Sequence, residues 1–426
     1  MQTLHYVNRS LLFGPYAWVC CMLTAVPTAA QEIIHLPTED RWLDADFEDV
    51  YHIGLPTGEV WEQFGRVDDV AFDGAGRLYV LDSQIGTVFV VGTDGNLIHQ
   101  FGQQGSGPGD FFEARQLLVM DDGRTVVIDF QARAYKLFDA NGRFERSVRY
   151  GDPSFSAIGD HMAERGSDGL ITVTIQPTSI SWSGEPPTWP DPVSRPIERV
   201  SLSGEEVVYD TIVEAYSPPL QPPDAGVGRF GSDWLPRYVE RSPRIYWGAL
   251  PDGRLAFSDS SAYAIKIAAA GTGVTRILTR PFQPEPISDD DIRDWKDARL
   301  ENLEKRSDEV LERPRLDDGR RVRPNANEER RRQRQLIENT QFYPHQSIVW
   351  SLSTTWNGKI WVWRRGQGGP GAIDVLDMEG TYVGSYSTET TRAPQAFGPN
   401  GLAAYIDYDE FDVHTVVVKR LPLEVN

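Results

Sequence analysis

Residues 67–101 read VDDVAFDGAGRLYVLDSQIGTVFVVGTDGNLIHQF, and this stretch decides the fold. It contains four short runs rich in β-branched and aromatic residues, separated by turns that contain glycine or aspartate. Runs of this kind predict four antiparallel strands joined by tight turns. Residues 115–148 repeat the same order of runs and turns, so the four-strand unit is a repeat.

The turn glycine before the second run of each unit recurs along the chain. It stands at Gly76, Gly123, Gly169, Gly253, Gly358 and Gly401. Three of the five intervals are 43, 46 and 47 residues, which is the size of one propeller blade. Six copies predict an all-β fold, a six-bladed β-propeller of four-stranded blades.

The two ends of the chain supply complementary parts of the last blade. The sixth copy offers only three strand-like runs, and a spare run lies ahead of the first copy at residues 47–53. Pairing this N-terminal strand with the last blade removes the strand edges that an open ring would expose. We therefore expect it to close the last blade.

The long insertions all belong to one kind of connection. Strands alternate in direction, so first-to-second and third-to-fourth turns share one face, which we call the plain face. Second-to-third turns and blade-to-blade connections share the other, which we call the loop-bearing face. The insertions 176–196, 214–243 and 283–342 all fall on the loop-bearing face. Binding residues concentrate on long loops held by a rigid scaffold, so we expect function there.

The insertion 283–342 has a helical pattern. Ser288 followed by three aspartates suits a helix N-terminus, and a second helix is expected at residues 328–339. The arginine cluster at residues 330–334 lies in a segment with almost equal numbers of acidic and basic residues. This balance favours a salt-bridged helical hairpin over a nucleic-acid patch.

Two stretches carry a family resemblance. Residues 76–83 read GRLYVLDS and residues 101–111 read FGQQGSGPGDF. They resemble the NHL-repeat class of six-bladed propellers, closely over residues 64–150 and more loosely beyond. The resemblance implies the propeller fold. It leaves function open among protein or RNA binding, extracellular sensing, and lyase or lactone-hydrolase chemistry with a metal in the channel.

Polar residues at the starts of the innermost strands are candidates for the central channel. They are Asp68, Asp69, Arg115, His161, Arg244, His345 and Gln395. Such groups can grip an anion or transfer protons, and they can equally be hydrogen-bonded structural residues. A register error of one residue would turn each side chain away from the channel.

Aspartates recur at the ends of the second strands, at Asp82, Asp129, Asp259 and Asp407. Their oxygens suit Ca²⁺, the one possible cofactor that the sequence indicates. Their recurrence in several blades favours a structural role, with each carboxylate accepting N–H groups of its own turn. The loop aromatics Trp182, Trp189 and Trp234 either stack on a ligand or pin their loops to the propeller.

The first 30 residues have the pattern of a secretory signal. Arg9 is their only formal charge, an apolar run covers residues 11–26, and small residues precede the expected cleavage after Ala30. We expect a secreted or periplasmic protein in which residues 31–426 form one propeller domain. Both cysteines lie in the signal, where the bulky Trp18 and Val19 argue against a lipid-attachment site.

Charge and motifs narrow the function. The chain has 62 acidic and 42 basic residues, a net charge of −20, which excludes nucleic acid as a favoured partner. No later segment is long and apolar enough for a membrane span. No P-loop, zinc-protease helix or nucleophile elbow is present, so catalytic residues are unknown.

Three hypotheses remain. The leading one is non-enzymatic binding of a protein, peptide or glycan on the loop-bearing face. The alternative is a metal-dependent hydrolase or lyase, similar to a lactonase, that uses the central channel. The third is a structural part of a larger envelope complex, with the helical hairpin as its docking element.

Overall fold

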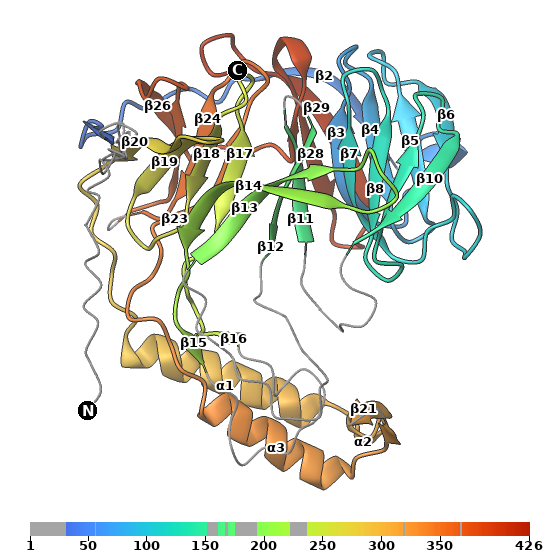
Figure 1. Cartoon of the computed structure of the whole chain (residues 1–426), viewed down its shortest axis with the longest axis vertical. Helices are drawn as coiled ribbons and strands as arrows, with labels where there is room; N and C mark the ends of the chain where they lie inside the picture. The colour runs from blue at the N-terminus through green and yellow to red at the C-terminus, as the bar shows by residue number, and fades with distance from the viewer. Residues whose placement is uncertain are drawn as a thin grey trace, which may run out of the picture. The chain divides into compact units, whose positions relative to one another are not determined.

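Six sheets, each containing four antiparallel strands, confirm the predicted six-bladed propeller (Figure 1). The computed structural model describes residues 31–55, 57–150, 161–166, 169–174, 194–221, 237–317, 320–366 and 369–426. The first strands of neighbouring blades contact one another around the axis, and the later strands lie progressively farther out. In this order, we call the strands of a blade A to D.

The strand bounds define the blades. Blade one holds β3 (Val67–Phe72), β4 (Leu78–Asp82), β5 (Thr87–Val91) and β6 (Leu97–Phe101). Blade two holds β7 (Ala114–Val119), β8 (Thr125–Asp129), β9 (Ala134–Phe138) and β10 (Phe144–Arg149). Blade three holds β11 (His161–Gly166), β12 (Gly169–Thr174), β13 (Ser194–Ser201) and β14 (Val208–Tyr216).

The second half of the ring follows the same plan. Blade four holds β17 (Tyr246–Ala249), β18 (Leu255–Ser258), β19 (Ala264–Ala269) and β20 (Gly273–Thr279). Blade five holds β23 (Val349–Thr354), β24 (Ile360–Arg364), β25 (Ala372–Leu376) and β26 (Tyr382–Ser387). Blade six holds β27 (Ala396–Phe397), β28 (Leu402–Tyr408), β29 (His414–Arg420) and the N-terminal β2 (Glu48–Ile53).

The pairing of β2 with β29 confirms the predicted closure of the ring. The two strands are antiparallel, with Tyr51 opposite Val418 and Ile53 opposite Val416. A second pairing was not expected from the sequence: β1 (Glu32–His35) adds to β20 as a parallel fifth strand of blade four. In the chain between β1 and β2, Trp42 forms a backbone bridge with Ser385 of blade five. Residues 31–53 therefore follow the outer edges of blades four and five before they complete blade six; we call them the N-terminal belt.

A buried cluster of four charged side chains fastens this belt. Asp374 of β25 accepts hydrogen bonds from Arg280, at 3.0 Å, and from Arg364, whose Nε is 3.0 Å from Oδ2. Both guanidinium groups also reach Asp40 of the belt, at 2.8 Å and 2.6 Å. Arg280, Arg364 and Asp374 are almost completely buried. Every charge in this belt cluster therefore has an opposite partner.

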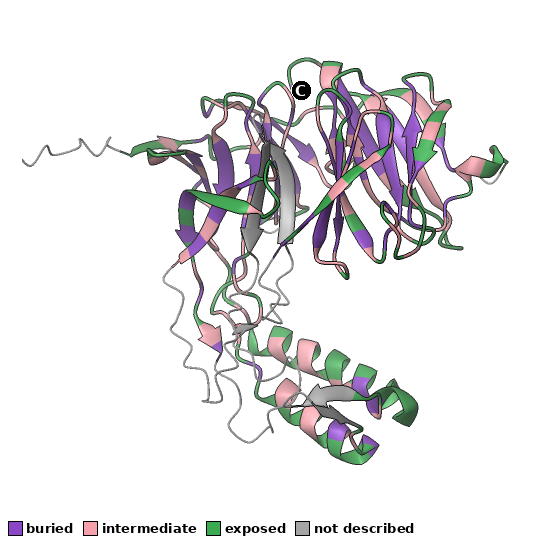
Figure 2. Ribbon diagram, turned by 45° about the vertical axis from the view of Figure 1, so that its right-hand side comes forward, coloured by how far each residue is buried: buried purple, intermediate pink, exposed green. Residues whose placement is uncertain are grey.

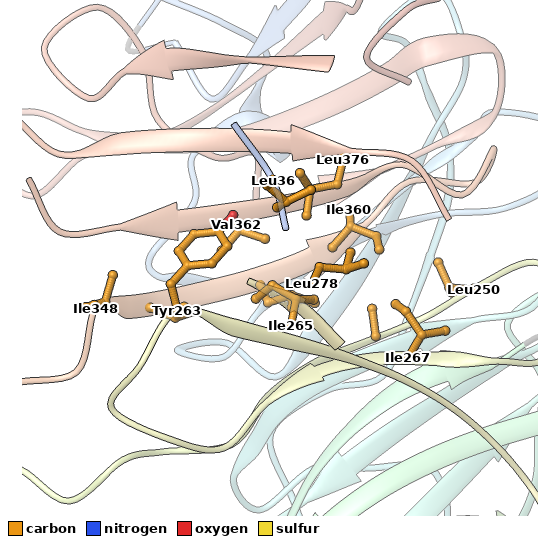
Figure 3. Packing of buried hydrophobic residues seen from close by; sticks show 13 residues of the cluster. Leu36, Leu250, Tyr263, Ile265, Ile267, Leu278, Ile348, Ile360, Val362 and Leu376 are labelled. Atoms are coloured by element: carbon orange, nitrogen blue, oxygen red, sulfur yellow. The ribbon is translucent and has the colours of Figure 1, made fainter. Parts of the chain in front are cut away.

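Apolar packing between neighbouring blades forms the core. Figure 3 shows Leu36 of the belt among Leu278 of blade four and Ile360 and Leu376 of blade five. Figure 2 shows that the strands are mainly buried, whereas the helices are mainly exposed. Strands such as β4 and β5 are buried at every position, as expected for sheets covered on both faces.

Tight turns on the plain face need glycine. Gly76, Gly123, Gly253, Gly358 and Gly401 all have φ between 79° and 86°, a conformation that other residues rarely adopt. At Gly401 a β-carbon would lie 2.8 Å from the carbonyl oxygen of Leu421. These positions confirm the turn repeat; Gly169 instead is the first residue of β12.

The insertion between blades four and five confirms the predicted helical hairpin (Figure 1). Its elements are α1 (Asp289–Lys305), α2 (Asp308–Leu311), β21 (Arg315–Asp317), β22 (Arg320–Val322) and α3 (Ala326–Glu338). Ser288 caps α1 by accepting a hydrogen bond from Asp291 N at 3.1 Å. Arg330 pairs with Asp308 at 2.9 Å and Arg334 pairs with Glu304, so the arginine cluster is salt-bridged as predicted. None of the helices among the described residues is long and apolar enough to cross a membrane.

The smaller elements lie in connections. Two strands, β15 (Leu220–Gln221) and β16 (Arg237–Tyr238), pair with each other between blades three and four. A short 3-10 helix, η1 (Val60–Glu62), precedes blade one, and η3 (Pro399–Gly401) forms the A-to-B turn of blade six.

We predict that Asp374→Ala destabilises the protein by about 3–5 kcal/mol, because it leaves two buried guanidinium groups with one carboxylate between them. Urea denaturation followed by circular dichroism measures the loss. Asp290→Ala is the matched control, since Asp290 is also ion-paired, to Arg293, but is exposed, and its loss is expected to stay below about 1 kcal/mol. Equal losses in the two variants would contradict the role given to the belt cluster.

Candidate functional site

The strand bounds place the three long connections on the loop-bearing face. One lies between β12 and β13, within blade three. The others join β14 to β17 and β20 to β23, from blade to blade. The predicted loop aromatics Trp182, Trp189 and Trp234 lie outside the described residues.

A β-bulge recurs where innermost strands enter from this face. In β3 the register moves from Val67 opposite Asp82 to Asp69 opposite Leu81, which leaves Asp68 as the extra residue. The corresponding extra residues are Arg115 in β7 and Trp350 in β23. Bulges re-aim side chains and are typical of functional rims. The bulges therefore present these residues at the mouth of the channel.

Two of the bulged residues, Asp68 and Arg115, were predicted as channel candidates. Asp68 accepts a hydrogen bond from Arg66 Nε at 2.7 Å, and Arg115 pairs with Glu113. Each is thus partnered by the residue two positions before it. These local pairs occupy the charges, so neither residue stands free at the mouth.

The third bulged residue, Trp350, was missed by the sequence reasoning. Its ring lies 5.8 Å from that of Trp363 in β24, with an interplanar angle of 60°. The guanidinium of Arg365 lies over Trp350, 4.9 Å from the ring centroid. The two indoles are 43% and 38% exposed, in strands whose other large apolar residues are buried. The sequence signal that could have identified this site was the pair of tryptophans, but their exposure depends on a bulge that the sequence pattern does not reveal.

The other predicted channel residues separate from one another. Arg244 is exposed ahead of β17. His345 is exposed and forms a backbone bridge with Pro286, so it belongs to the base of the helical insertion rather than to β23, where the sequence placed it. His161 is the first residue of β11, and its side chain lies outside the described part of the structure.

Asp69 and Gln395 line a cavity of 270 Å³ at the plain-face end of the channel. The cavity lies among the ends of the innermost strands of five blades, from β3, β7, β17, β23 and β27. Asp69 Oδ2 accepts a hydrogen bond from Leu117 N of blade two at 2.8 Å. Burial raises the pKa of Asp69 to about 7, even though hydrogen bonds from the backbone N–H groups of Leu117 and Val70 act to lower it. Asp69 therefore links two blades and titrates near neutral pH.

The aspartates at the ends of B strands are mostly structural. Asp82 accepts hydrogen bonds from the backbone N–H groups of Gly65 at 2.7 Å and of Gln84 at 3.0 Å. Asp129 likewise accepts from Phe112 N at 2.8 Å and Ala132 N at 3.0 Å. Both therefore bind their own turn, as predicted, and also the connection that enters the blade.

The remaining two aspartates depart from the prediction. Asp259 accepts from Tyr216 N at 2.8 Å and pairs with Lys266 at 2.7 Å, rather than binding its own turn. Asp407 is exposed and pairs with Arg392 at 2.5 Å. Among the described residues, no three His, Cys, Asp or Glu side chains converge as metal ligands, so Ca²⁺ stays a prediction.

A larger hollow of 720 Å³ lies between the helical hairpin and the connection from blade three to blade four. Its charged lining is largely paired within the protein: Arg306 donates to Gln333 at 3.0 Å, and Arg332 pairs with Glu329. Arg299 instead stacks on Trp295, with its guanidinium 5.0 Å from the ring centroid. The hollow adds concave, polar surface beside the propeller, without a catalytic grouping.

Comparison with known proteins supports the fold. A family model described as a 6-bladed beta-propeller matches residues 28–156, which include the N-terminal belt and blades one and two. No curated protein matches the chain.

The solved structures that align have low sequence identity. A protein from Bacteroides fragilis described as exported has 14% identity and a TM-score of 0.47, covering 92% of this chain and 99% of its own. A streptogramin B lyase has 10% identity and a TM-score of 0.40, covering 87% and 97%. A gluconolactonase from Xanthomonas campestris has 11% identity and a TM-score of 0.37, covering 90% and 99%.

We predict that Asp69 makes stability fall as pH rises. Its pKa is about 7 in the folded protein and near the ordinary 3.8 when unfolded, so the folded state holds the proton more tightly between these values. The contribution of Asp69 to the free energy of unfolding is complete below about pH 4 and is lost as pH rises to about 7. Asp69→Asn should flatten this part of the profile, as measured by urea unfolding at pH 4.5 and 7.5. Asp68→Asn is the neighbouring control; a profile of Asp69→Asn that parallels wild type would contradict the assignment.

Proposed function

We propose that this protein is an exported, non-enzymatic binding module that takes a protein, peptide or glycan ligand on its loop-bearing face. Export is supported by the signal-like pattern of residues 1–30. The observation that carries the proposal is the position of the exposed large apolar side chains, most of which lie on the loop-bearing face.

Of the large hydrophobic side chains that are exposed among the described residues, more than half lie on or at the loop-bearing face. They are Leu55, Val60, Ile85, Phe112, Tyr216, Trp350, Trp363, Tyr408 and Phe411. They come from blades one, two, three, five and six and from the connections between them. Contiguous apolar patches rimmed by polar residues are typical of interaction sites, and Trp350 and Trp363 are in ring contact with each other on this face.

Two of these side chains show how far the apolar surface projects. Phe411, in the turn between β28 and β29, is 78% exposed, and Val60, in η1, is 85% exposed. Holding such groups in water is unfavourable by roughly 25 cal/mol for each Å² of apolar surface, so a partner that covers them gains binding free energy. The turn of Phe411 is itself ordered: Asp409 accepts hydrogen bonds from Phe411 N at 2.8 Å and Val413 N at 3.0 Å. A preordered turn loses little entropy on binding.

Among the described residues, fewer observations favour the alternative of a hydrolase or lyase that uses the channel than favour the binding module. The bulged Asp68 and Arg115 are occupied by local ion pairs, and Asp69 faces the plain-face end of the channel. Nucleophilic catalysis needs a nucleophile with a base within hydrogen-bond reach. The binding proposal needs only the surface already described.

We predict that replacing Tyr408 and Phe411 by serine weakens ligand binding about tenfold or more, because truncating a central aromatic contact commonly costs over 1 kcal/mol. The measurement is binding of the labelled protein to a printed array of peptides and oligosaccharides. Leu423→Ser is the matched control: Leu423 is 84% exposed but follows β29 on the plain face.

Wild type and Leu423→Ser should bind the same array positions with similar strength. Binding that survives in the double variant, or that Leu423→Ser removes, would contradict the choice of face. An array without any bound position would contradict the binding function for these ligand classes.

A further inference from the structure

We infer that Trp350, Trp363 and Arg365 form a binding subsite for a neutral saccharide at the channel mouth. The inference rests on the proposed function and names one ligand class for the same face. Its basis is the geometry of two exposed indoles beside planar polar groups.

The two rings are held in place by the backbone. Trp350 Nε1 donates a hydrogen bond to Ser347 O at 3.1 Å, which fixes the ring on the bulge of β23. Trp363 follows Trp361 by two residues in β24, so both lie on the same side of the sheet. Trp361 is buried against blade six, whereas Trp363 emerges at the end of the strand. The exposed ring therefore continues an ordered row and needs little reorganisation to bind.

Polar groups border the rings. Arg365 stacks on Trp350, and no described residue accepts a hydrogen bond from its Nε. Asp291, at the start of α1, is close enough to Arg365 and Arg241 that both lower the pKa of its carboxyl, after the larger effect of hydrogen bonds from Ser288. Gln346 Nε2 lies 3.5 Å from Asp291 Oδ2. A guanidinium group thus borders the aromatic surface, and a carboxylate and an amide lie on the side of that guanidinium.

This combination fits a sugar better than an apolar peptide. The C–H face of a pyranose covers an aromatic ring, while its hydroxyls accept and donate hydrogen bonds at the ring's edge. An apolar peptide side chain could also cover the open indoles, but it would make no hydrogen bond to the adjoining polar groups, whereas the hydroxyls of a sugar can. The net charge of −20 opposes polyanions, so a neutral saccharide is favoured over an acidic one.

Affinity electrophoresis tests the subsite. The full-length mature protein is run in native gels that contain laminarin, xylan or galactomannan as neutral probes, and polygalacturonate as the acidic probe. We expect at least one neutral polysaccharide to retard the protein and polygalacturonate not to do so. Trp350→Ala and Trp363→Ala should each weaken retardation about tenfold, and Trp350→Phe should retain part of it.

Trp42→Ala is the matched control, because Trp42 is 55% exposed but lies on the belt along blade five. Thermal melts verify that each variant is folded; if Trp350→Ala does not fold, Trp363→Ala and Trp350→Phe carry the test. No retardation by a neutral probe, retardation by polygalacturonate alone, or equal loss in Trp42→Ala would overturn the inference. If neutral probes fail while array peptides still bind and are lost with the Tyr408 and Phe411 variant, the saccharide subsite is wrong and the binding face stands.

Discussion

Closure of the ring positions all six blades, and the belt cluster stabilises the segment that closes it. Blade six obtains its outer strand from the N-terminus, so the belt must first pass blades four and five along a defined path. Arg280 fixes that path by donating to the carbonyl oxygens of Pro37 and Thr38 and by pairing with Asp40. Buried charges are tolerated only when every partner is in place. The cluster therefore selects one route for the belt as well as stabilising it.

The belt cluster is a variation on a pair that other blades also contain. In blades two and four an aspartate at the end of strand B pairs with a lysine on strand C, as Asp129 does with Lys136 at 3.2 Å. The lysine lies opposite the residue two positions before the aspartate. In blade five the same two positions hold Arg364 and Asp374, with the charges exchanged. The exchange matters because a carboxylate on strand C can also accept from Arg280 of blade four, which a lysine there could not do.

The sequence predicted the parts of the fold that depend on short-range periodicity and failed where long-range pairing decides. Strand repeats, the closing strand and the capped helix at Ser288 follow from alternation, turn glycine and capping chemistry. The parallel strand β1 has four residues and no turn that joins it to β20, so the local sequence does not indicate its partner. Trp350 was missed because the bulge that exposes it exists only in the pairing of β23 with β24. His345 was misplaced because the inner strand begins later, at Val349.

We propose the loop-bearing face as the ligand surface. Closure of the ring makes this face rigid, and exposed aromatic side chains supply its chemistry. Hydroxyl-radical footprinting with mass spectrometry tests this proposal, on residues 31–426 with and without a neutral polysaccharide that retards the protein. We expect the oxidation of Trp350 and Trp363 to fall when the ligand is present, while the oxidation of Trp42 and of Leu423 on the plain face stays unchanged. Protection of Leu423 or Trp42, with Trp350 and Trp363 as reactive as in the free protein, would contradict the proposal.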